Sequence, residues 1–258
     1  ESDSSHHGVA MTGDLNNITI KNCEIENFYR GINIKYRAEV SNLTIKDNII
    51  KNPTQYSISI DIPSGYGSVV GSNIANNQII GTFLGIYLYE GEYNLVSNNT
   101  VTGTSSAAIL VIGSHNIIDS NAVRDTISSS SSIQASGNNA TISNNDITHS
   151  GPVYMRATNS TIIGNKIYNN KRGGISITAD AKSNTLITKN IIYGVLDGEA
   201  INLMAKAKIT ENDIYGNRLN IRADESGAYP LELSVDGVGN YWGHTDPEKP
   251  CFFVYLGG

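Results

Sequence analysis

The chain has little charge and little cysteine, and each shortage excludes a class of protein. Asp, Glu, Lys and Arg make up 16% of the 258 residues, well below the roughly 25% of an average soluble domain. The net charge of −6 argues against a nucleic-acid-binding surface. Two cysteines are too few for a disulfide framework. No run of 18 apolar residues occurs, so we expect no insertion into a membrane.

Two residue types are abundant instead. The chain contains 31 Asn and 35 Ile, which together form about a quarter of the sequence. This is too much Ile for a disordered segment. It leaves too little Ala, Leu, Glu and Lys for a helical bundle. The composition therefore indicates a soluble, β-rich chain built from repeats.

The repeat is a unit of about 23 residues. Each unit has an Asn, an alternating x-Ile-x-Ile segment, a second Asn, an apolar pair, a loop of small residues and a Gly-Ile-x-Ile segment. The first full copy runs from Asn17 to Ile34 and the seventh from Asn159 to Ile177. The first copy has Cys23 at the second Asn position; the others have Asn48, Asn77, Asn99, Asn121, Asn145, Asn165, Asn190 and Asn212.

Each unit predicts three short strands separated by turns, because its apolar residues alternate and no segment suits a crossover helix. Such units stack into a solenoid whose interior is filled by Ile and Val. We expect the recurring Asn to occupy the left-handed region of backbone space at a tight turn. Aligned coil on coil, the Asn amides would also form a hydrogen-bonded ladder.

Residues 8–221, which carry these repeats, resemble the right-handed parallel β-helix repeat family of the pectate-lyase-like superfamily. The resemblance implies an all-β, right-handed parallel β-helix of nine to ten coils, in a secreted or cell-surface protein. Gly239 to Gly243 resembles the segment that closes such helices, so we divide the chain into a β-helix domain, 1–238, and a closing segment, 239–258. Because the first repeat begins in mid-coil, we expect a longer parent protein or a neighbouring domain or chain that caps this end.

The resemblance also implies where a site would lie. In the enzymes of this superfamily the groove runs over the sheet that follows the variable loop, here the Gly-Ile-x-Ile strands. Alternation places Lys35, Asp61, Tyr87, Tyr89 and Glu90 on the outer face of three successive coils. We expect a polysaccharide to stack on tyrosines and to bind the charged groups there. The alternative is a cross-strand tyrosine ladder beside a solvated Lys–Asp pair.

A second group lies three coils further on, where Tyr154 and Arg156 face outward and His149 lies in the preceding loop. A solvated loop histidine is the alternative role for His149. Together with the first group, this gives the predicted substrate-binding residues Lys35, Tyr87, Tyr89, His149 and Tyr154.

The catalytic candidates are Asp61, Glu90 and Arg156. A lyase needs a base and a cation that neutralises the uronate carboxylate, and Arg156 or Lys35 with a Tyr fits this requirement. A hydrolase needs two carboxylates about 5–9.5 Å apart, which Asp61 and Glu90 would supply. The same pair offers oxygen ligands for Ca²⁺. The histidines show no metal-ligand spacing, and the superfamily's catalytic motifs are absent from the sequence.

Two functions therefore stay open. The first is a secreted or surface-attached domain that binds a polysaccharide along one sheet, with or without cleavage by a lyase or glycoside hydrolase reaction. The second is a non-catalytic structural or adhesive module of a surface or fibre protein.

Overall fold

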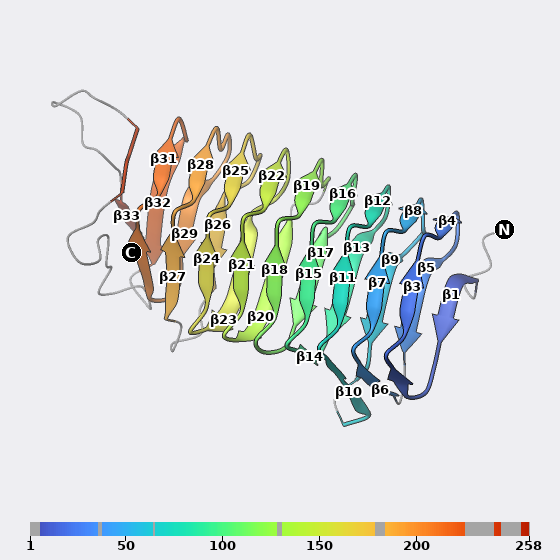
Figure 1. Ribbon diagram of the computed structural model, residues 1–258. Helices are drawn as coiled ribbons and strands as arrows, with labels where there is room; N and C mark the ends of the chain where they lie inside the picture. The colour runs from blue at the N-terminus through green and yellow to red at the C-terminus, as the bar shows by residue number, and fades with distance from the viewer. Residues whose placement is uncertain are drawn as a thin grey trace, which may run out of the picture.

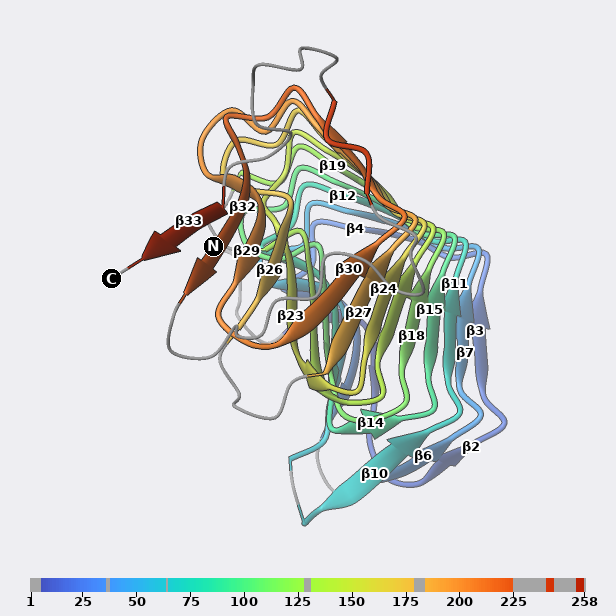
Figure 2. The ribbon, with the colours of Figure 1, turned by 90° about the vertical axis from the view of Figure 1, so that its left-hand side faces the viewer.

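The computed structural model describes residues 6–35, 38–63, 65–127, 131–178, 184–224, 240–243 and 254–257. These residues form a solenoid whose coils lie side by side along one axis (Figure 1). Three long parallel sheets run the length of the solenoid, and a fourth, shorter sheet extends from one corner (Figure 2). The predicted all-β parallel β-helix is confirmed. None of the described segments is a helix long and apolar enough to cross a membrane.

Sheet 1 is formed by the Gly-Ile-x-Ile segments. Its strands, in spatial order, are β1 (His7–Met11), β5 (Arg30–Lys35), β9 (Tyr56–Asp61), β13 (Leu84–Tyr89), β17 (Ile109–Ile112), β20 (Ile133–Asn138), β23 (Val153–Thr158), β26 (Ile175–Ile177), β29 (Glu199–Leu203), β32 (Leu219–Asp224) and β33 (Val254–Gly257).

Sheets 2 and 3 are formed by the strands on either side of the recurring Asn. Sheet 2 contains β3 (Thr19–Lys21), β7 (Thr44–Lys46), β11 (Asn73–Ala75), β15 (Leu95–Ser97), β18 (Ile117–Asp119), β21 (Thr141–Ser143), β24 (Thr161–Ile163), β27 (Thr185–Thr188) and β30 (Ala207–Thr210). Sheet 3 contains β4 (Glu24–Glu26), β8 (Ile49–Lys51), β12 (Gln78–Ile80), β16 (Thr100–Thr102), β19 (Ala122–Arg124), β22 (Asp146–Thr148), β25 (Lys166–Tyr168), β28 (Ile191–Tyr193) and β31 (Asp213–Tyr215). The short sheet 4 contains β2 (Leu15–Asn16), β6 (Ala38–Ser41), β10 (Gly67–Val70) and β14 (Gly91–Glu92).

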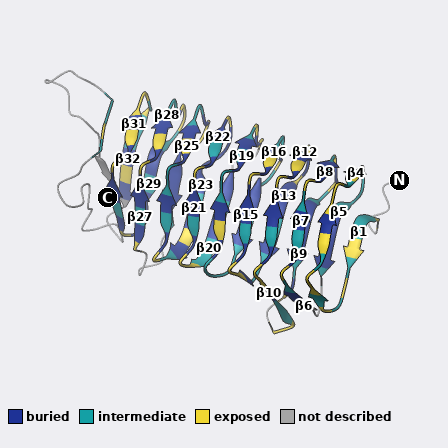
Figure 3. Ribbon diagram, in the orientation of Figure 1, coloured by how far each residue is buried: buried dark blue, intermediate teal, exposed yellow. Residues whose placement is uncertain are grey.

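The interior is a column of aliphatic side chains held in register. Ile162 pairs with Ile187, and Ile187 with Ile209, so the same side chain recurs at the same place in each coil of sheet 2. These three residues are fully buried. Figure 3 shows buried positions recurring from one coil to the next. The burial removes the repeated Ile from water, which supplies the main driving force for stacking.

The recurring Asn forms the predicted ladder at the corner between sheets 2 and 3. Asn121 is typical: its Nδ2 donates to Asn145 Oδ1 at 3.0 Å, and its Oδ1 accepts from Asn99 Nδ2 at 3.0 Å. The Oδ1 also accepts from the Asn99 backbone N–H at 2.9 Å. The eight ladder residues from Asn48 to Asn212 are at most 1% exposed. The ladder therefore satisfies the backbone groups of a buried corner, where an unpaired group would be costly.

The predicted left-handed conformation of the ladder Asn is wrong. The residue with positive φ is the one immediately before it, for example Asn76, Asn98 and Asn144, with φ of 56°, 54° and 53°. Gly164, Lys189 and Glu211 hold the same place in later coils. Two adjacent residues therefore form the turn. The first adopts the left-handed conformation that reverses the chain, and the second, the buried Asn, makes the hydrogen bonds.

The other two corners repeat this arrangement with more varied residues. Between sheets 1 and 2, the backbone N–H of Asn94 donates to Asn116 Oδ1 at 3.0 Å. Between sheets 3 and 1, the backbone N–H of Ser150 donates to Asn170 Oδ1 at 2.9 Å. All three corners therefore use side chains to satisfy the backbone of the neighbouring coil.

Near the C-terminus, residues 240–243 continue the outermost coil. Asn240 extends the ladder, because its Oδ1 accepts from Asn212 Nδ2 at 2.8 Å. Trp242 packs against the core, and Tyr241 lies at the end of a ring stack that includes Tyr215 and Tyr193. The predicted domain boundary between residues 238 and 239, and Cys251, lie outside the described residues. Cys23 is a free thiol.

The ladder generates a stability prediction. Asn121→Ala removes an acceptor from two donors of Asn99 and a donor from Asn145 Oδ1. Asn99 Nδ2 still donates to the Ile74 carbonyl, and Asn145 Oδ1 still accepts from the Asn121 backbone N–H, so the Asn99 backbone N–H is the group of these three that is left unpaired. Because a buried polar group left unpaired costs about 1–3 kcal/mol, we expect a loss of about 1–3 kcal/mol in urea unfolding. Thr100→Ala, at an exposed neighbouring position on β16, is the control and should cost less than about 1 kcal/mol. Equal losses in the two variants would contradict the role of the ladder.

A second prediction concerns acid stability. Partial burial works against ionisation of Asp119, but hydrogen bonds from Ser143, Ser120 and Asn144 outweigh it and hold the pKa of its carboxyl below the usual value. The carboxylate therefore contributes stability that is complete above its unfolded pKa of about 3.9. This contribution is lost as the pH falls through the lower, folded pKa. The stability difference between the wild type and Asp119→Asn should be largest near neutral pH and shrink below about pH 4.

Chemical unfolding at pH 7 and at pH 3 measures this difference. Glu92→Gln removes one negative charge from an exposed position on β14 and serves as the control for net charge. A difference for Asp119→Asn that is the same at both pH values would contradict the assignment.

Candidate functional site

The outer face of sheet 1 brings the first predicted group together. Lys35, Asp61 and Tyr89 lie side by side on β5, β9 and β13, and Asn33, Ser59 and Tyr87 form the adjacent row. Asn33 and Ser59 point away from the interior, yet both are buried. Facing outward on this sheet therefore does not by itself expose a side chain to solvent.

Arg30 organises this surface, although the sequence analysis did not single it out. Its Nε donates to Gln55 Oε1 at 2.6 Å and its Nη1 to Asn33 Oδ1 at 2.9 Å. Its guanidinium carbon lies 4.8 Å from the centre of the Tyr56 ring, a cation–π geometry. Arg30 and Tyr56 pair with each other in the register of sheet 1. Each directly precedes the small residue at the start of its repeat's sheet 1 segment, so an alignment of the repeats at that preceding position would have identified both.

The tyrosines of this group stack on one another. Tyr56 and Tyr87 have ring centres 5.4 Å apart at 20°, and Tyr87 and Tyr89 are 6.1 Å apart at 35°. The faces of Tyr56 are thus covered by Arg30 and Tyr87. A sugar ring needs such a face for stacking, so this arrangement matches the cross-strand ladder that the sequence left open.

Tyr87 is poorly suited to act as a base. Burial, followed by the negative charge of Asp61, raises the pKa of its phenol to about 12. A general base works best with a pKa near the operating pH, so Tyr87 keeps its proton under neutral conditions.

Asp61 lines a small cavity of about 150 Å³ with Arg30, Lys35 and Pro63. Pro63 belongs to the loop that follows Asp61, so the start of this loop borders the cavity. The later residues of the loop form β10 in sheet 4. Glu90 is not part of the described lining; it follows Tyr89 with a φ of 55° at the turn that leaves the sheet. Asp61 and Glu90, predicted to act as a carboxylate pair or to bind Ca²⁺, therefore do not share this cavity.

Tyr154 and Arg156 line a separate hollow of about 330 Å³ on the same face. Ser131, Gln134 and Thr178 complete its described lining. Arg156 is exposed, and its side chain makes no ion pair or hydrogen bond within the described ranges. Tyr154 likewise stacks on no ring of the described residues. Both side chains are thus available to a ligand.

The catalytic candidates do not form one centre. Four strand-to-strand steps separate β9, which carries Asp61, from β23, which carries Arg156. At roughly 4.8 Å per step this is about 19 Å. Asp61 and Arg156 therefore line two separate hollows of one sheet.

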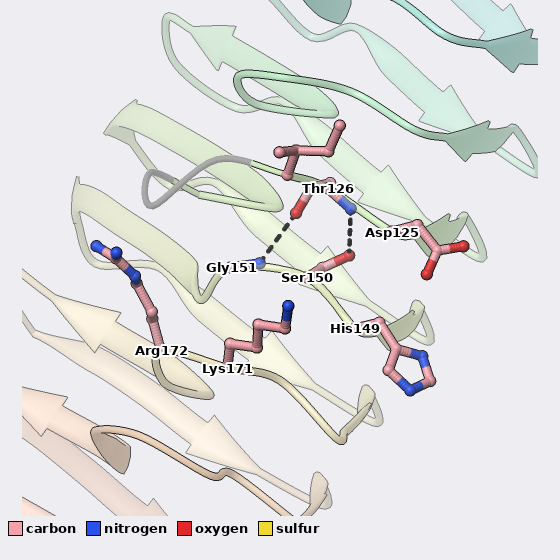
Figure 4. A pocket seen from close by; sticks show the side chains of 8 residues that line it. Asp125, Thr126, His149, Ser150, Gly151, Lys171 and Arg172 are labelled. Carbon is pink, nitrogen blue, oxygen red and sulfur yellow. Dashed lines mark hydrogen bonds between the residues drawn. The ribbon is translucent and has the colours of Figure 1, made fainter.

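His149 lies in a third region, at the corner between sheets 3 and 1 (Figure 4). It lines a hollow of about 460 Å³ whose described lining does not include Tyr154. Lys171 and Arg172 line this hollow too, and the sequence analysis missed both. They lie in a connection between strands, where the Ile alternation that aligned the repeats gives no guide.

Within the described ranges, no group of three or more His, Cys, Asp or Glu residues is placed to hold a metal ion. This includes the neighbourhood of Asp61.

Comparison with known families agrees with the repeat and the fold. Residues 2–122 match the family model described as periplasmic copper-binding protein (NosD). No curated protein matches the chain. Residues 84–233, more than half of the chain, match the family model of the right-handed β-helix region. The resemblance inferred from the Asn and Ile repeats is confirmed: the chain belongs to the right-handed β-helix family.

Proposed function

We propose that the outer face of sheet 1 binds an anionic polysaccharide, with the hollow at Tyr154 and Arg156 as its principal subsite. The observation that carries this proposal is the exposed guanidinium of Arg156, which pairs with no described residue, beside a tyrosine ring that stacks on no described ring, in a hollow of about 330 Å³. A guanidinium binds a carboxylate through two parallel hydrogen bonds, and a tyrosine face packs against the apolar face of a sugar ring. Uronate residues combine both features.

The proposal is for binding rather than cleavage. Hydrolysis of a glycosidic bond uses two carboxylates about 5–9.5 Å apart, and the described lining of the hollow contains none. The hollow holds a cation and hydroxyl and amide groups, which suit recognition of an acidic sugar.

We also propose that the protein works outside the cytoplasm. The name of the NosD family places that family in the periplasm, and the match to residues 2–122 supports a location outside the cytoplasm. The same name refers to copper. The described residues offer no cluster of three or more His, Cys, Asp or Glu ligands for such an ion, so they do not fit a copper site of that kind.

Binding of polygalacturonate, measured by isothermal titration calorimetry, tests the proposal. Arg156→Ala and Tyr154→Ala should each weaken the affinity about tenfold, which corresponds to about 1.4 kcal/mol. Arg124→Ala removes the same charge from sheet 3, where Arg124 pairs with Asp146 at 3.2 Å, and should leave the affinity unchanged.

Two results would contradict the proposal. One is no binding across a panel of uronate polysaccharides, which would favour the structural or adhesive module. The other is unchanged affinity in Arg156→Ala. Absorbance at 235 nm and reducing-end assays on the same mixtures detect cleavage by elimination or hydrolysis.

A further inference from the structure

The hollow at the corner between sheets 3 and 1 arises from unequal connections in three successive coils. The middle connection consists of His149 and the small residues Ser150, Gly151 and Pro152. The coil before it contributes Ile127, and the coil after it contributes Lys171 and Arg172. The short middle connection therefore leaves a notch of about 460 Å³ between two taller neighbours.

The floor of this notch is held in place by its own hydrogen bonds. Gly151 N–H donates to Thr126 Oγ1 at 3.0 Å, and Thr126 N–H donates to Ser150 Oγ at 3.3 Å. The Ser150 hydroxyl donates in turn to the Thr148 carbonyl at 2.9 Å. Both hydroxyl groups are buried. The floor is thus a preformed surface and not a set of polar groups awaiting a partner.

The described lining of the notch carries two cations and one carboxylate. Figure 4 shows Lys171 extending toward the segment of Ser150 and Gly151, with Arg172 on one side of it and His149 and Asp125 on the other. Both cations are exposed, and neither side chain makes an ion pair or hydrogen bond within the described part of the chain. Asp125 is the one carboxylate of the described lining, so the two cations outnumber it and are available to an anion.

We propose that this notch binds the phosphate group of a phosphate monoester. A phosphate monoester carries a charge of about −1.5 to −2 at pH 7, and the two cations of the described lining outnumber its one carboxylate, so the notch attracts this group. Its oxygens accept two hydrogen bonds from the planar fork of Arg172, and Lys171 adds a point charge. Ile127, which is 79% exposed on the opposite wall, contacts the apolar part of the group that carries the phosphate.

This inference is independent of the polysaccharide proposal, because the two hollows share none of their described lining residues. Arg156 belongs to one, and Lys171 and Arg172 to the other. The failure of one proposal is therefore distinguishable from the failure of the other.

The test is calorimetric titration of the whole chain with inorganic phosphate and with phenyl phosphate at fixed ionic strength. The double variant Lys171→Ala/Arg172→Ala should weaken binding of both probes at least tenfold. The control Lys21→Ala/Lys46→Ala removes the same charge from two register neighbours on sheet 2 and should change it less than twofold. Arg156→Ala should also leave it unchanged. Circular dichroism confirms that each variant is folded.

Ile127 is tested in the same experiment. Phenyl phosphate should bind more tightly than inorganic phosphate, and Ile127→Ala should remove that advantage while retaining binding of inorganic phosphate. The proposal is overturned if the wild type shows no saturable binding of either probe. It is also overturned if the sheet 2 control loses as much affinity as Lys171→Ala/Arg172→Ala, since attraction to net charge would then account for the binding.

Discussion

The structure depends on keeping successive coils in register. A single coil of about 23 residues cannot bury its own Ile and Val side chains, so each coil is stable only when a neighbour covers it. Parallel pairing fixes the spacing, and the Asn ladder fixes the lateral position, because an amide displaced by one residue would lose its partners on both sides. Hydrophobic burial supplies the energy of stacking, and the ladder supplies its alignment.

This division frees the outer surface. Since the interior residues and the ladder hold the coils, outward side chains and connections vary without disturbing the core. On sheet 1, Arg30 and the stacked tyrosines close one part of the face by covering each other's rings. Further along the same sheet, Tyr154 and Arg156 leave a hollow open. The two parts of the face differ in which side chains neighbouring coils carry at equivalent positions. A hollow forms where these side chains do not cover one another.

The fold was predictable from the sequence because one repeated pattern determines it. Ile alternation marked the strands, and the spacing of Asn48, Asn77 and Asn99 marked the ladder. The candidate site was harder to predict from the sequence. Alternation correctly placed Lys35 beside Asp61, but it could not show that Arg30 binds Asn33 or that ring stacking covers Tyr56. Those contacts depend on long side chains bending across the sheet. Lys171 and Arg172 lie outside any strand, where periodicity carries no information about the direction of a side chain.

The orientation of the ladder has a mechanical consequence. Its hydrogen bonds, like those of the three sheets, link one coil to the next and so run along the axis of the solenoid, whereas the covalent backbone runs around it. A force that pulls the two ends apart therefore acts on the boundaries between coils, and the outermost coil, which has a neighbour on one side only, can detach without the others. A force across the axis is carried by the backbone of many coils together. The protein is accordingly an anisotropic material, compliant to peeling from its ends and stiff to compression of its sides.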